Sequence, residues 1–278
     1  MYRQFGAVVT AALTALPVMP RAASASPPEV DNIAHRGASA YAPENTIASC
    51  ALARELRADA CELDIQETRD HQLVLMHDAT LARTTNVEQL FPGRSPWRVA
   101  DFTLAEIQQL DAGSWFSPRY RGVQVPTLEQ MLRATSGSRI RLLLEIKHAP
   151  RTPEDIDRRV AAELQANRRW WTKERLAVQA FDWQSMRNFH SLMPDVPIAL
   201  LGKPAVDRLA EVAAYADSVN LPHVGLTPEY VKEVHDQGMR VYTWSVHRRA
   251  VIRQLISYGV DGIMTNRPDH LAHVERHR

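Results

Sequence analysis

Cysteine is scarce in this chain, since only Cys50 and Cys61 occur among 278 residues. Neither has a neighbour at the spacing of a zinc site, which excludes a structural zinc held by cysteines. The pair could form one disulfide if the protein is exported. Both cysteines nevertheless stand in segments that resemble regular elements, where a buried free thiol behaves as a small hydrophobic side chain. We therefore expect two free thiols, although the sequence leaves the disulfide open.

An excess of positive charge is also lacking, because 33 Lys and Arg residues stand against 32 Asp and Glu residues. Proteins that bind the nucleic acid backbone normally carry a basic stripe, so this balance argues against a nucleic-acid partner. Beyond the first thirty residues there is no apolar run long enough to cross a bilayer. We therefore expect no stable membrane insertion of the mature chain.

The one long apolar run lies at the N-terminus. Arg3 precedes an apolar stretch over residues 5–19, and small residues follow it. This order is typical of an export signal, residues 1–25. The alternative is an uncleaved membrane anchor, but Pro17 interrupts the run, which is shorter than the ~20 residues that a spanning helix needs. We expect the mature protein, residues 26–278, to be a single soluble domain in the periplasm or outside the cell.

Short apolar runs alternate with amphipathic stretches along the mature chain, the pattern expected of a parallel sheet with helical crossovers. This predicts an α/β fold, either a closed barrel or an open doubly wound sheet. The length of the mature chain is close to the roughly 250 residues of a typical (β/α)₈ barrel. The predicted strands are 32–36, 60–66, 141–147, 176–181, 197–201, 218–221, 240–246 and 262–265. The predicted helices open at Pro43–Glu44 and at Thr127, and cover 155–167, 182–192, 205–215, 228–237, 249–258 and 269–274.

One region breaks this alternation. Residues 68–71 predict a turn that returns the chain through residues 73–76 as a hairpin, which would bring His77 back beside the strand of Glu62. Residues 79–125 are then an insertion, rich in turn residues and carrying the large aromatic residues Trp97, Trp115 and Phe116.

Carboxylates follow two of the predicted strands. Glu62 and Asp64 are two residues apart, so their side chains leave the same face of a strand, and Glu145 ends another apolar run. In a barrel such residues can point inward at the C-terminal ends of the strands. Three oxygen donors suit one hard cation, Ca²⁺ or Mg²⁺, whereas zinc would recruit imidazole or thiolate. We predict a site for one divalent cation, against the alternative of surface ion pairs.

Two histidines, His35 and His77, also follow apolar runs. An imidazole with its ordinary pKa of ~6.5 can both accept and donate a proton near neutral pH, and hydrolysis of a phosphodiester needs both acts. The residues themselves do not decide which histidine is the base. Arg36 and Lys147 are the cations that would offset the charge of the acids and hold a phosphate.

These residues lie in an ordered series of motifs that resembles the glycerophosphodiester phosphodiesterase family. The series runs from about Asn32 to Pro268 and consists of Ile33-Ala34-His35-Arg36-Gly37, Ala42-Pro43-Glu44-Asn45-Thr46, Cys61-Glu62-Leu63-Asp64-Ile65-Gln66-Glu67-Thr68, Leu75-Met76-His77-Asp78, Leu110-Asp111-Ala112-Gly113-Ser114-Trp115-Phe116, Val125-Pro126-Thr127-Leu128-Glu129, Leu144-Glu145-Ile146-Lys147, Tyr242-Thr243-Trp244-Ser245-Val246 and Asp261-Gly262-Ile263-Met264-Thr265-Asn266.

The resemblance implies a (β/α)₈ TIM barrel with a small capping insertion after the second strand. It implies that Glu62, Asp64 and Glu145 are the metal ligands and that His35 and His77 are catalytic; we assign His77 as the base and His35 as the acid. The implied activity is metal-dependent hydrolysis of glycerophosphodiesters, such as glycerophosphocholine or glycerophosphoethanolamine, to sn-glycerol 3-phosphate and an alcohol.

Four further residues carry less specific expectations. Glu44, expected in the first turn of a helix, either complements the helix dipole or, as the resemblance implies, lies beside the metal or the glycerol. Phe181 and Trp244 either form an apolar wall against the substrate or pack in the core. His71 stands where the hairpin turn of the family usually has glycine, so the chain departs from the family pattern at that turn.

Two other functions are compatible with the sequence. The same site could act on a lysophospholipid or on a polyglycerol-phosphate wall polymer, in which case the aromatic residues of the insertion would form a groove. Alternatively, the chain could be a non-catalytic binding protein on the same barrel. Such a protein would be expected to have lost a histidine or a carboxylate of the motifs, and all five are present.

Overall fold

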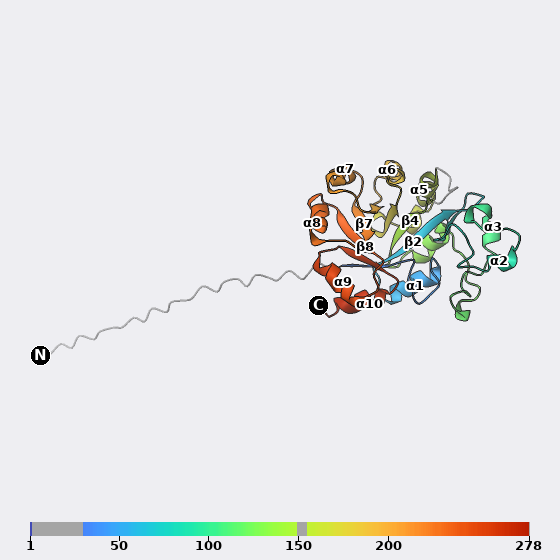
Figure 1. Cartoon of the computed structure of the whole chain (residues 1–278), viewed down its shortest axis with the longest axis horizontal. Helices are drawn as coiled ribbons and strands as arrows, with labels where there is room; N and C mark the ends of the chain where they lie inside the picture. Colours follow the sequence, from blue (N-terminus) through green and yellow to red (C-terminus); the bar gives the residue numbers. More distant parts are fainter. Residues whose placement is uncertain (2–29, 149–154, 278) are drawn as a thin grey trace.

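The computed structural model describes Met1, residues 30–148 and residues 155–277 (Figure 1). Apart from Met1, the predicted export signal lies outside these residues. Among the described residues, no helix has both the length and the apolar character that crossing a membrane requires.

Eight parallel strands close into a barrel. β1 pairs with β9 on one side and with β2 on the other, which completes the ring in the order β1-β9-β8-β7-β6-β5-β4-β2. The closed barrel is therefore confirmed and the open sheet is excluded. The strands are β1 Asp31–Ala34, β2 Ala60–Glu67, β4 Arg141–Ile146, β5 Leu176–Ala180, β6 Ile198–Leu201, β7 Ser218–Pro222, β8 Arg240–Trp244 and β9 Gly262–Thr265.

Helices surround the barrel in Figure 1. The outward residues of the strands are apolar and pack against them; on β2 these are Cys61, Leu63 and Ile65, which belong to the main core cluster. The helices are α1 Ile47–Glu55, α4 Leu128–Thr135, α5 Ile156–Ala166, α6 Trp183–Leu192, α7 Leu209–Val212, α8 Pro228–Asp236, α9 Arg249–Ser257 and α10 Pro268–Glu275. Short 3₁₀ helices cover Arg168–Trp170, Lys173–Arg175 and Val206–Arg208.

Two helix predictions were wrong in detail. The first helix begins at Ile47 and not at Pro43–Glu44, because Asn45 adopts a left-handed backbone with φ of 57° and Thr46 caps the helix by accepting the N–H of Ser49. Glu44 therefore lies in the loop before α1 and does not complement its dipole. The helix expected over residues 205–215 is split into the 3₁₀ turn Val206–Arg208 and the short α7.

The predicted hairpin is confirmed. β3, Leu73–Leu75, runs antiparallel to β2, and His71 takes the left-handed conformation at the turn with φ of 60°. The ring of His71 lies in hydrogen-bond contact with the buried carboxylate of Glu67, four residues earlier. A side-chain contact thus accompanies a backbone conformation that glycine adopts more easily.

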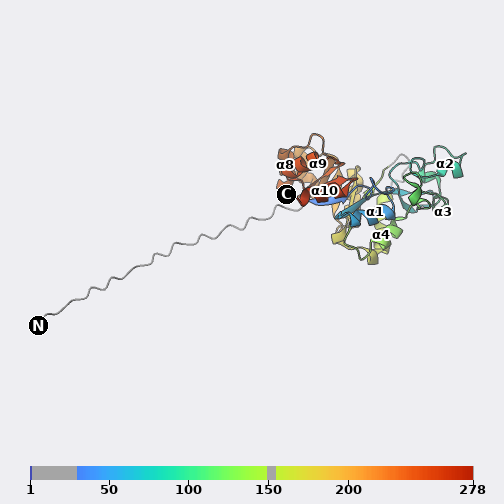
Figure 2. The same cartoon turned by 90° about the horizontal axis from the view of Figure 1, so that it is seen from below.

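The insertion builds a small core of its own next to the hairpin. Figures 1 and 2 place it at the end of the molecule towards which β2 points. Trp97 packs against this core and donates its indole N–H to the carbonyl of Phe91. The insertion contains α2 Val87–Leu90 and α3 Leu104–Ile107, with 3₁₀ turns at Val99–Asp101 and Pro118–Tyr120. Val74 and Met76 of the hairpin segment complete this small core, whose residues from the insertion are Leu81, Val87, Val99, Phe102, Ile107, Leu110, Ala112 and Val125.

Cys50 and Cys61 form a disulfide that links α1 to the start of β2, with Cα atoms 5.7 Å apart. The expectation of two free thiols was therefore wrong. The helix packs directly on the outward face of the strand, and this brings the two residues within the Cα separation that a disulfide requires. The bond closes a short loop around the turn between α1 and β2.

Loss of this bond should destabilise the protein. Replacing both residues (Cys50→Ala with Cys61→Ala) releases a constraint on the unfolded chain worth about 3 kcal/mol for a loop of this size. That corresponds to a fall of about 6 to 12 °C in melting temperature for a domain of this length. Thermal denaturation followed by circular dichroism measures the shift. Reductant should produce a similar fall in the wild type and none in the variant; a wild-type melting temperature that ignores reductant would contradict the disulfide.

Candidate active site

A cavity of about 190 Å³ opens at the C-terminal ends of the barrel strands. Its lining includes eight of the ten predicted site residues, namely His35, Arg36, Glu62, His77, Glu145, Lys147, Phe181 and Trp244. Gln179, Leu201, Ser245 and Met264, which were not predicted, complete the lining, whereas the predicted Asp64 and Glu44 are not part of it. A larger cavity of about 460 Å³ lies at the opposite, N-terminal end and is lined by none of the predicted site residues. The smaller cavity is therefore the candidate site, because the reactive groups converge there.

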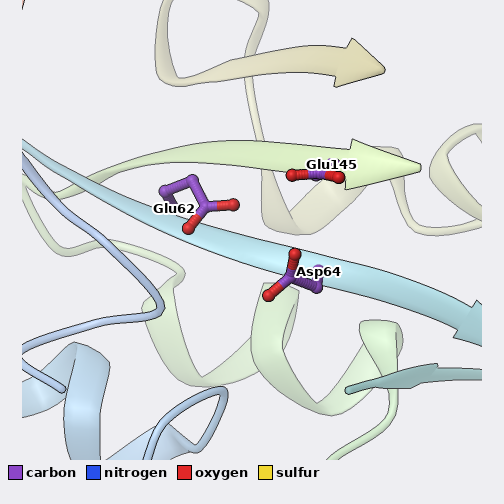
Figure 3. A group of neighbouring side chains, drawn as sticks. All are labelled: Glu62, Asp64 and Glu145. Atoms are coloured by element: carbon purple, nitrogen blue, oxygen red, sulfur yellow. The ribbon is translucent and has the colours of Figure 1, made fainter. Parts of the chain in front are cut away.

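Three carboxylates meet at this cavity: Glu62 and Glu145 are part of its lining, and Asp64 lies against them without lining it. Glu62 and Asp64 come from β2 and Glu145 from the adjacent β4, where it is paired with Asp64 in the sheet register (Figure 3). One oxygen from each lies within 4.8 Å of the others, and all three residues are buried. The two-residue spacing on β2 thus has the effect expected from the sequence, since both side chains face into the barrel.

The cluster has the electrostatic character of an ion site. Burial, together with the charges of Asp64 and Glu145, raises the pKa of Glu62 well above its ordinary value. Burial and the charge of Asp64 likewise raise the pKa of Glu145 to about 7. Burial also opposes ionisation of Asp64, but the charges of Lys147 and Arg36 outweigh it and lower the pKa of that carboxyl. Three mutually repelling oxygen donors of this kind fit a hard divalent cation.

Neutral donors orient two of the acids. The Asn45 side chain donates to Asp64 over 2.8 Å and accepts the Asp64 backbone N–H over 3.0 Å. The backbone N–H of Arg36 and the side chain of Gln179 donate to Glu62, over 2.9 and 3.4 Å. Gln179 in turn accepts from Asn220 inside the barrel, over 2.7 Å. Sequence reasoning missed these three amides; Asn45 follows Glu44 within a motif and was the one with a local signal.

The chain after β1 is shaped to present Arg36. Its φ is 56°, and Gly37 follows with φ of 79°. A side chain at position 37 would overlap Ser49 of α1, so only glycine lets the loop approach the helix this closely. This explains the glycine of the first motif by backbone geometry.

Both predicted histidines line the same cavity. The Nδ1 of His35 lies 2.8 Å from Oδ1 of Asn266 and 3.3 Å from Oγ of Ser245. Burial and the charge of Arg36 lower the pKa of His35 to about 4, so the ring is neutral near pH 7. The Nδ1 of His77 lies 2.7 Å from Oδ1 of Asp78. Each ring is thus held through Nδ1 by an oxygen acceptor.

The predicted cations flank the carboxylates. Lys147 lies 2.8 Å from Glu145 and 3.5 Å from Asp64, while the Arg36 guanidinium lies 3.5 Å from Asp64. Arg36 also donates to Glu44 over 3.0 Å. Glu44 is therefore attached to the site through Arg36, without belonging to the acidic cluster.

Arg83 of the insertion also reaches this network, although no sequence pattern had singled it out. Arg83 contacts Glu44 and Asp78. Burial raises the pKa of Asp78, but hydrogen bonds from Arg83 and His77 outweigh it and lower that pKa to about 2. Asp78 is therefore an anion at any functional pH and can accept the Nδ1–H of His77.

An aromatic pair also lines the cavity. Phe181 and Trp244 meet edge to face with ring centroids 6.0 Å apart, and Phe181 is 57% exposed. Core packing, the alternative weighed for these residues, is therefore excluded for Phe181. The insertion aromatics Trp97, Trp115 and Phe116 are absent from the described lining of the cavity, so they provide no groove at this site.

The buried acids should cost the metal-free protein stability. Since the pKa of Glu62 is raised above 4.5, the folded state holds a proton that the unfolded state loses, and stability falls as pH rises above that value. Glu62→Gln removes this cost. We expect the metal-free variant to melt about 2 to 4 °C above the wild type at pH 8, the effect of about 1 kcal/mol, with a smaller gain at pH 5.

Differential scanning fluorimetry with and without Ca²⁺ or Mg²⁺ tests this. The cation should stabilise the wild type and have little effect on Glu62→Gln. Glu67→Gln is the matched control, because Glu67 is buried on the same strand but contacts His71 and Arg159 outside the cluster; it should keep the response to the cation and show no gain. Equal melting of metal-free wild type and Glu62→Gln at both pH values would argue against the like-charge cluster.

Comparison with known proteins gives a consistent result. Residues 35–270 match the model of the glycerophosphoryl diester phosphodiesterase family. A glycerophosphodiester phosphodiesterase of Bacillus subtilis is 34% identical over 261 residues, covering 88% of this chain and 86% of that protein. One from Caldanaerobacter subterraneus subsp. tengcongensis is 33% identical over 246 residues, covering 88% of this chain and 97% of that protein.

A solved structure also shares the fold. The phosphodiesterase OLEI02445 of Oleispira antarctica, in complex with the product sn-glycerol-3-phosphate, superposes with a TM-score of 0.77 at 25% identity, covering 88% of this chain and 96% of that one. The family match includes seven of the eight barrel strands, from β2 to β9, together with the acidic cluster and both histidines. The chain therefore belongs to the glycerophosphoryl diester phosphodiesterase family.

Proposed function

We propose that this glycerophosphodiester phosphodiesterase hydrolyses compact diesters such as glycerophosphocholine and glycerophosphoethanolamine, releasing sn-glycerol 3-phosphate and the free alcohol. The observation that carries the proposal is that one cavity brings two histidines to a cluster of three carboxylates. The product bound by the Oleispira relative supports the same bond being cleaved. A cavity of about 190 Å³ favours a small substrate, since pockets for drug-sized ligands measure roughly 300 to 1,000 Å³.

Arg36 and Lys147 are proposed to bind the phosphate. The Nε of Arg36 is buried 3.5 Å from Asp64 but donates no hydrogen bond to any described residue, so this donor is still available to a phosphate. Glu62, Asp64 and Glu145 would hold the divalent cation, Ca²⁺ or Mg²⁺. When bound, that ion would neutralise the cluster and offset the negative charge that the diester brings. Without such compensation the three acids would repel the substrate.

The histidines are proposed to transfer the two protons of the reaction. Asn266 accepts the Nδ1–H of His35, and the neutral ring then keeps a lone pair on Nε2. This supports His35 as the base that takes a proton from the attacking oxygen, either water or the neighbouring hydroxyl of the glycerol. His77 would then donate a proton to the departing alkoxide. This order is the reverse of the one we assigned from the sequence.

Phe181 and Trp244 are proposed to contact the glycerol or the head group. Both rings line the cavity, so carbon atoms of the substrate can lie against them. A substrate spanning the cavity would place its phosphate among the cations and its apolar part against this wall.

Export to the periplasm or beyond the cell remains part of the proposal. The N-terminal apolar run with Arg3 supports it, and so does the Cys50–Cys61 disulfide, since such bonds persist mainly in oxidising compartments. A cytosolic enzyme would be expected to keep both thiols reduced.

The other two functions have less support. A lysophospholipid or a wall polymer would need an extended groove, and the insertion aromatics that were expected to form one do not line the cavity within the described part of the chain. A non-catalytic binding protein would not need two imidazoles held by acceptors beside an acidic cluster.

Activity measurements with purified protein test the substrate and the metal together. Glycerol phosphate should appear from glycerophosphocholine, faster than from its acylated analogue, and excess chelator should abolish the reaction. Adding back Ca²⁺ and Mg²⁺ separately identifies the preferred ion. Turnover undiminished in chelator would exclude the metal assignment, and preference for the acylated diester would overturn the substrate assignment.

Removal of either imidazole should stop the chemistry while leaving the fold intact. We expect His35→Ala and His77→Ala each to lower kcat by about 10²- to 10⁴-fold, the usual contribution of a general acid or base. His190→Ala, on α6 and outside the cavity lining, is the matched control and should keep wild-type kcat. If both site variants turn over at the wild-type rate, neither histidine is catalytic.

A further inference from the structure

Arg83 connects two separate parts of the active site. Its Nε and Nη2 lie 2.6 and 3.2 Å from the two carboxylate oxygens of Asp78. Its Nη1 and Nη2 lie 2.9 and 2.7 Å from the two oxygens of Glu44, 39 residues away in the sequence. One guanidinium therefore forms a two-point contact with each of two acids, a geometry that the planar arginine fork permits and a lysine ammonium does not.

Each acid is attached to a different half of the site. Asp78 accepts from Nδ1 of His77 over 2.7 Å, which fixes the orientation of that ring. Glu44 accepts from Arg36 over 3.0 Å, and Arg36 in turn contacts Glu62 through its backbone N–H and Asp64 through its guanidinium. An unbroken chain of polar contacts thus runs from the histidine to the carboxylate cluster, and Arg83 is its central member.

Removing Arg83 would release both the Arg36 side and the His77 side of the site. Glu44, whose side chain is 12% exposed, would keep Arg36 as its cation and draw that guanidinium away from the phosphate position. Asp78 would lose the partner that orients it, and the His77 ring would lose its fixed acceptor. Exposed ion pairs usually contribute little to stability. A network of two-point contacts around a partly buried acid nevertheless restricts the orientation of the side chains that form it.

We propose that Arg83 is a positioning residue that holds His77 through Asp78 and Arg36 through Glu44, so that the insertion is a working part of the active site. This inference rests on the proposed function, since His77 and Arg36 act there on the diester. It also explains why the insertion lies beside this end of β2.

Steady-state kinetics on glycerophosphocholine separate the two effects. Arg83→Met should lower kcat by about 10- to 100-fold, as loss of an orienting partner does, and should raise KM. Arg83→Lys should recover only part of either loss. Arg94→Met is the matched control: Arg94 lies in the insertion, over the ring of Phe102 at 3.7 Å, and bonds to Glu106 over 2.7 Å. It should lower the melting temperature and leave kcat and KM unchanged.

Double mutants test which contact of Arg83 is responsible for the change in kcat and which for the change in KM. Asp78→Asn should reproduce the kcat loss and Glu44→Gln the KM increase. If the contacts act as units, adding Arg83→Met to Asp78→Asn should lower kcat no further, and adding it to Glu44→Gln should raise KM no further. Full additivity in both pairs would refute the positioning role.

Chemical rescue distinguishes positioning from folding. Millimolar guanidinium should restore part of the kcat of Arg83→Ala in a saturable manner and have no such effect on Arg94→Met. Wild-type kinetics in Arg83→Met, or a loss in Arg83→Ala that guanidinium does not restore, would overturn the inference.

A measurement that needs no substrate, the NMR spectrum of the His77 ring, tests this inference separately from the proposed function. The ¹⁵N shifts of the His77 ring should show a single Nδ1–H tautomer in the wild type and a mixture in Arg83→Ala. If the wild type were inactive on every diester, the proposed function would fail, while this spectrum would still support or overturn the role of Arg83; identical ring spectra in the two proteins would overturn it.

Discussion

The repulsion among three buried carboxylates is the constraint around which this site is organised. Glu62, Asp64 and Glu145 are buried with oxygens within 4.8 Å of one another, and Lys147 and Arg36 lie against them. Three acids with two cations leave the pocket short of positive charge, and burial together with the charge of Asp64 raises the pKa of Glu145 to about 7. The cluster therefore has the properties of a site for a divalent cation, and it carries a cost to the metal-free fold that a core built for stability alone would avoid.

The barrel is what makes this arrangement possible. Alternate residues of β2 face inward, and the parallel pairing of β2 with β4 sets Asp64 beside Glu145. Outward residues of the same strands pack against the helices, so the acids are held by a rigid wall. Two of the left-handed backbone positions, Arg36 and Asn45, occur in the loop after β1, where the chain turns to direct a cation and an amide at the acids.

The cavity lining combines charged and apolar groups. Glu62, Glu145, the two cations and the histidines line it together with the aromatic pair of Phe181 and Trp244. This combination matches a small diester with a charged phosphate and uncharged carbon atoms. The insertion contacts the charged groups through Arg83 and contributes none of its large aromatic residues to the described lining.

The sequence by itself determined the alternation of strands and helices, the shared face of Glu62 and Asp64, and the positions of both histidines. Each of these depends on the spacing of residues within a single segment or motif. Only the tertiary structure decided the contacts of Arg83 with Glu44, of Gln179 with Glu62 and of Cys50 with Cys61. In each of these the partners come from different elements, and their meeting depends on how a helix, a loop or an inserted segment packs on the barrel. The start of α1 was misjudged for a local reason, since the left-handed backbone of Asn45 has no periodic signal in the sequence. Periodicity identifies which face of an element is buried, but the partner found on that face is set by packing.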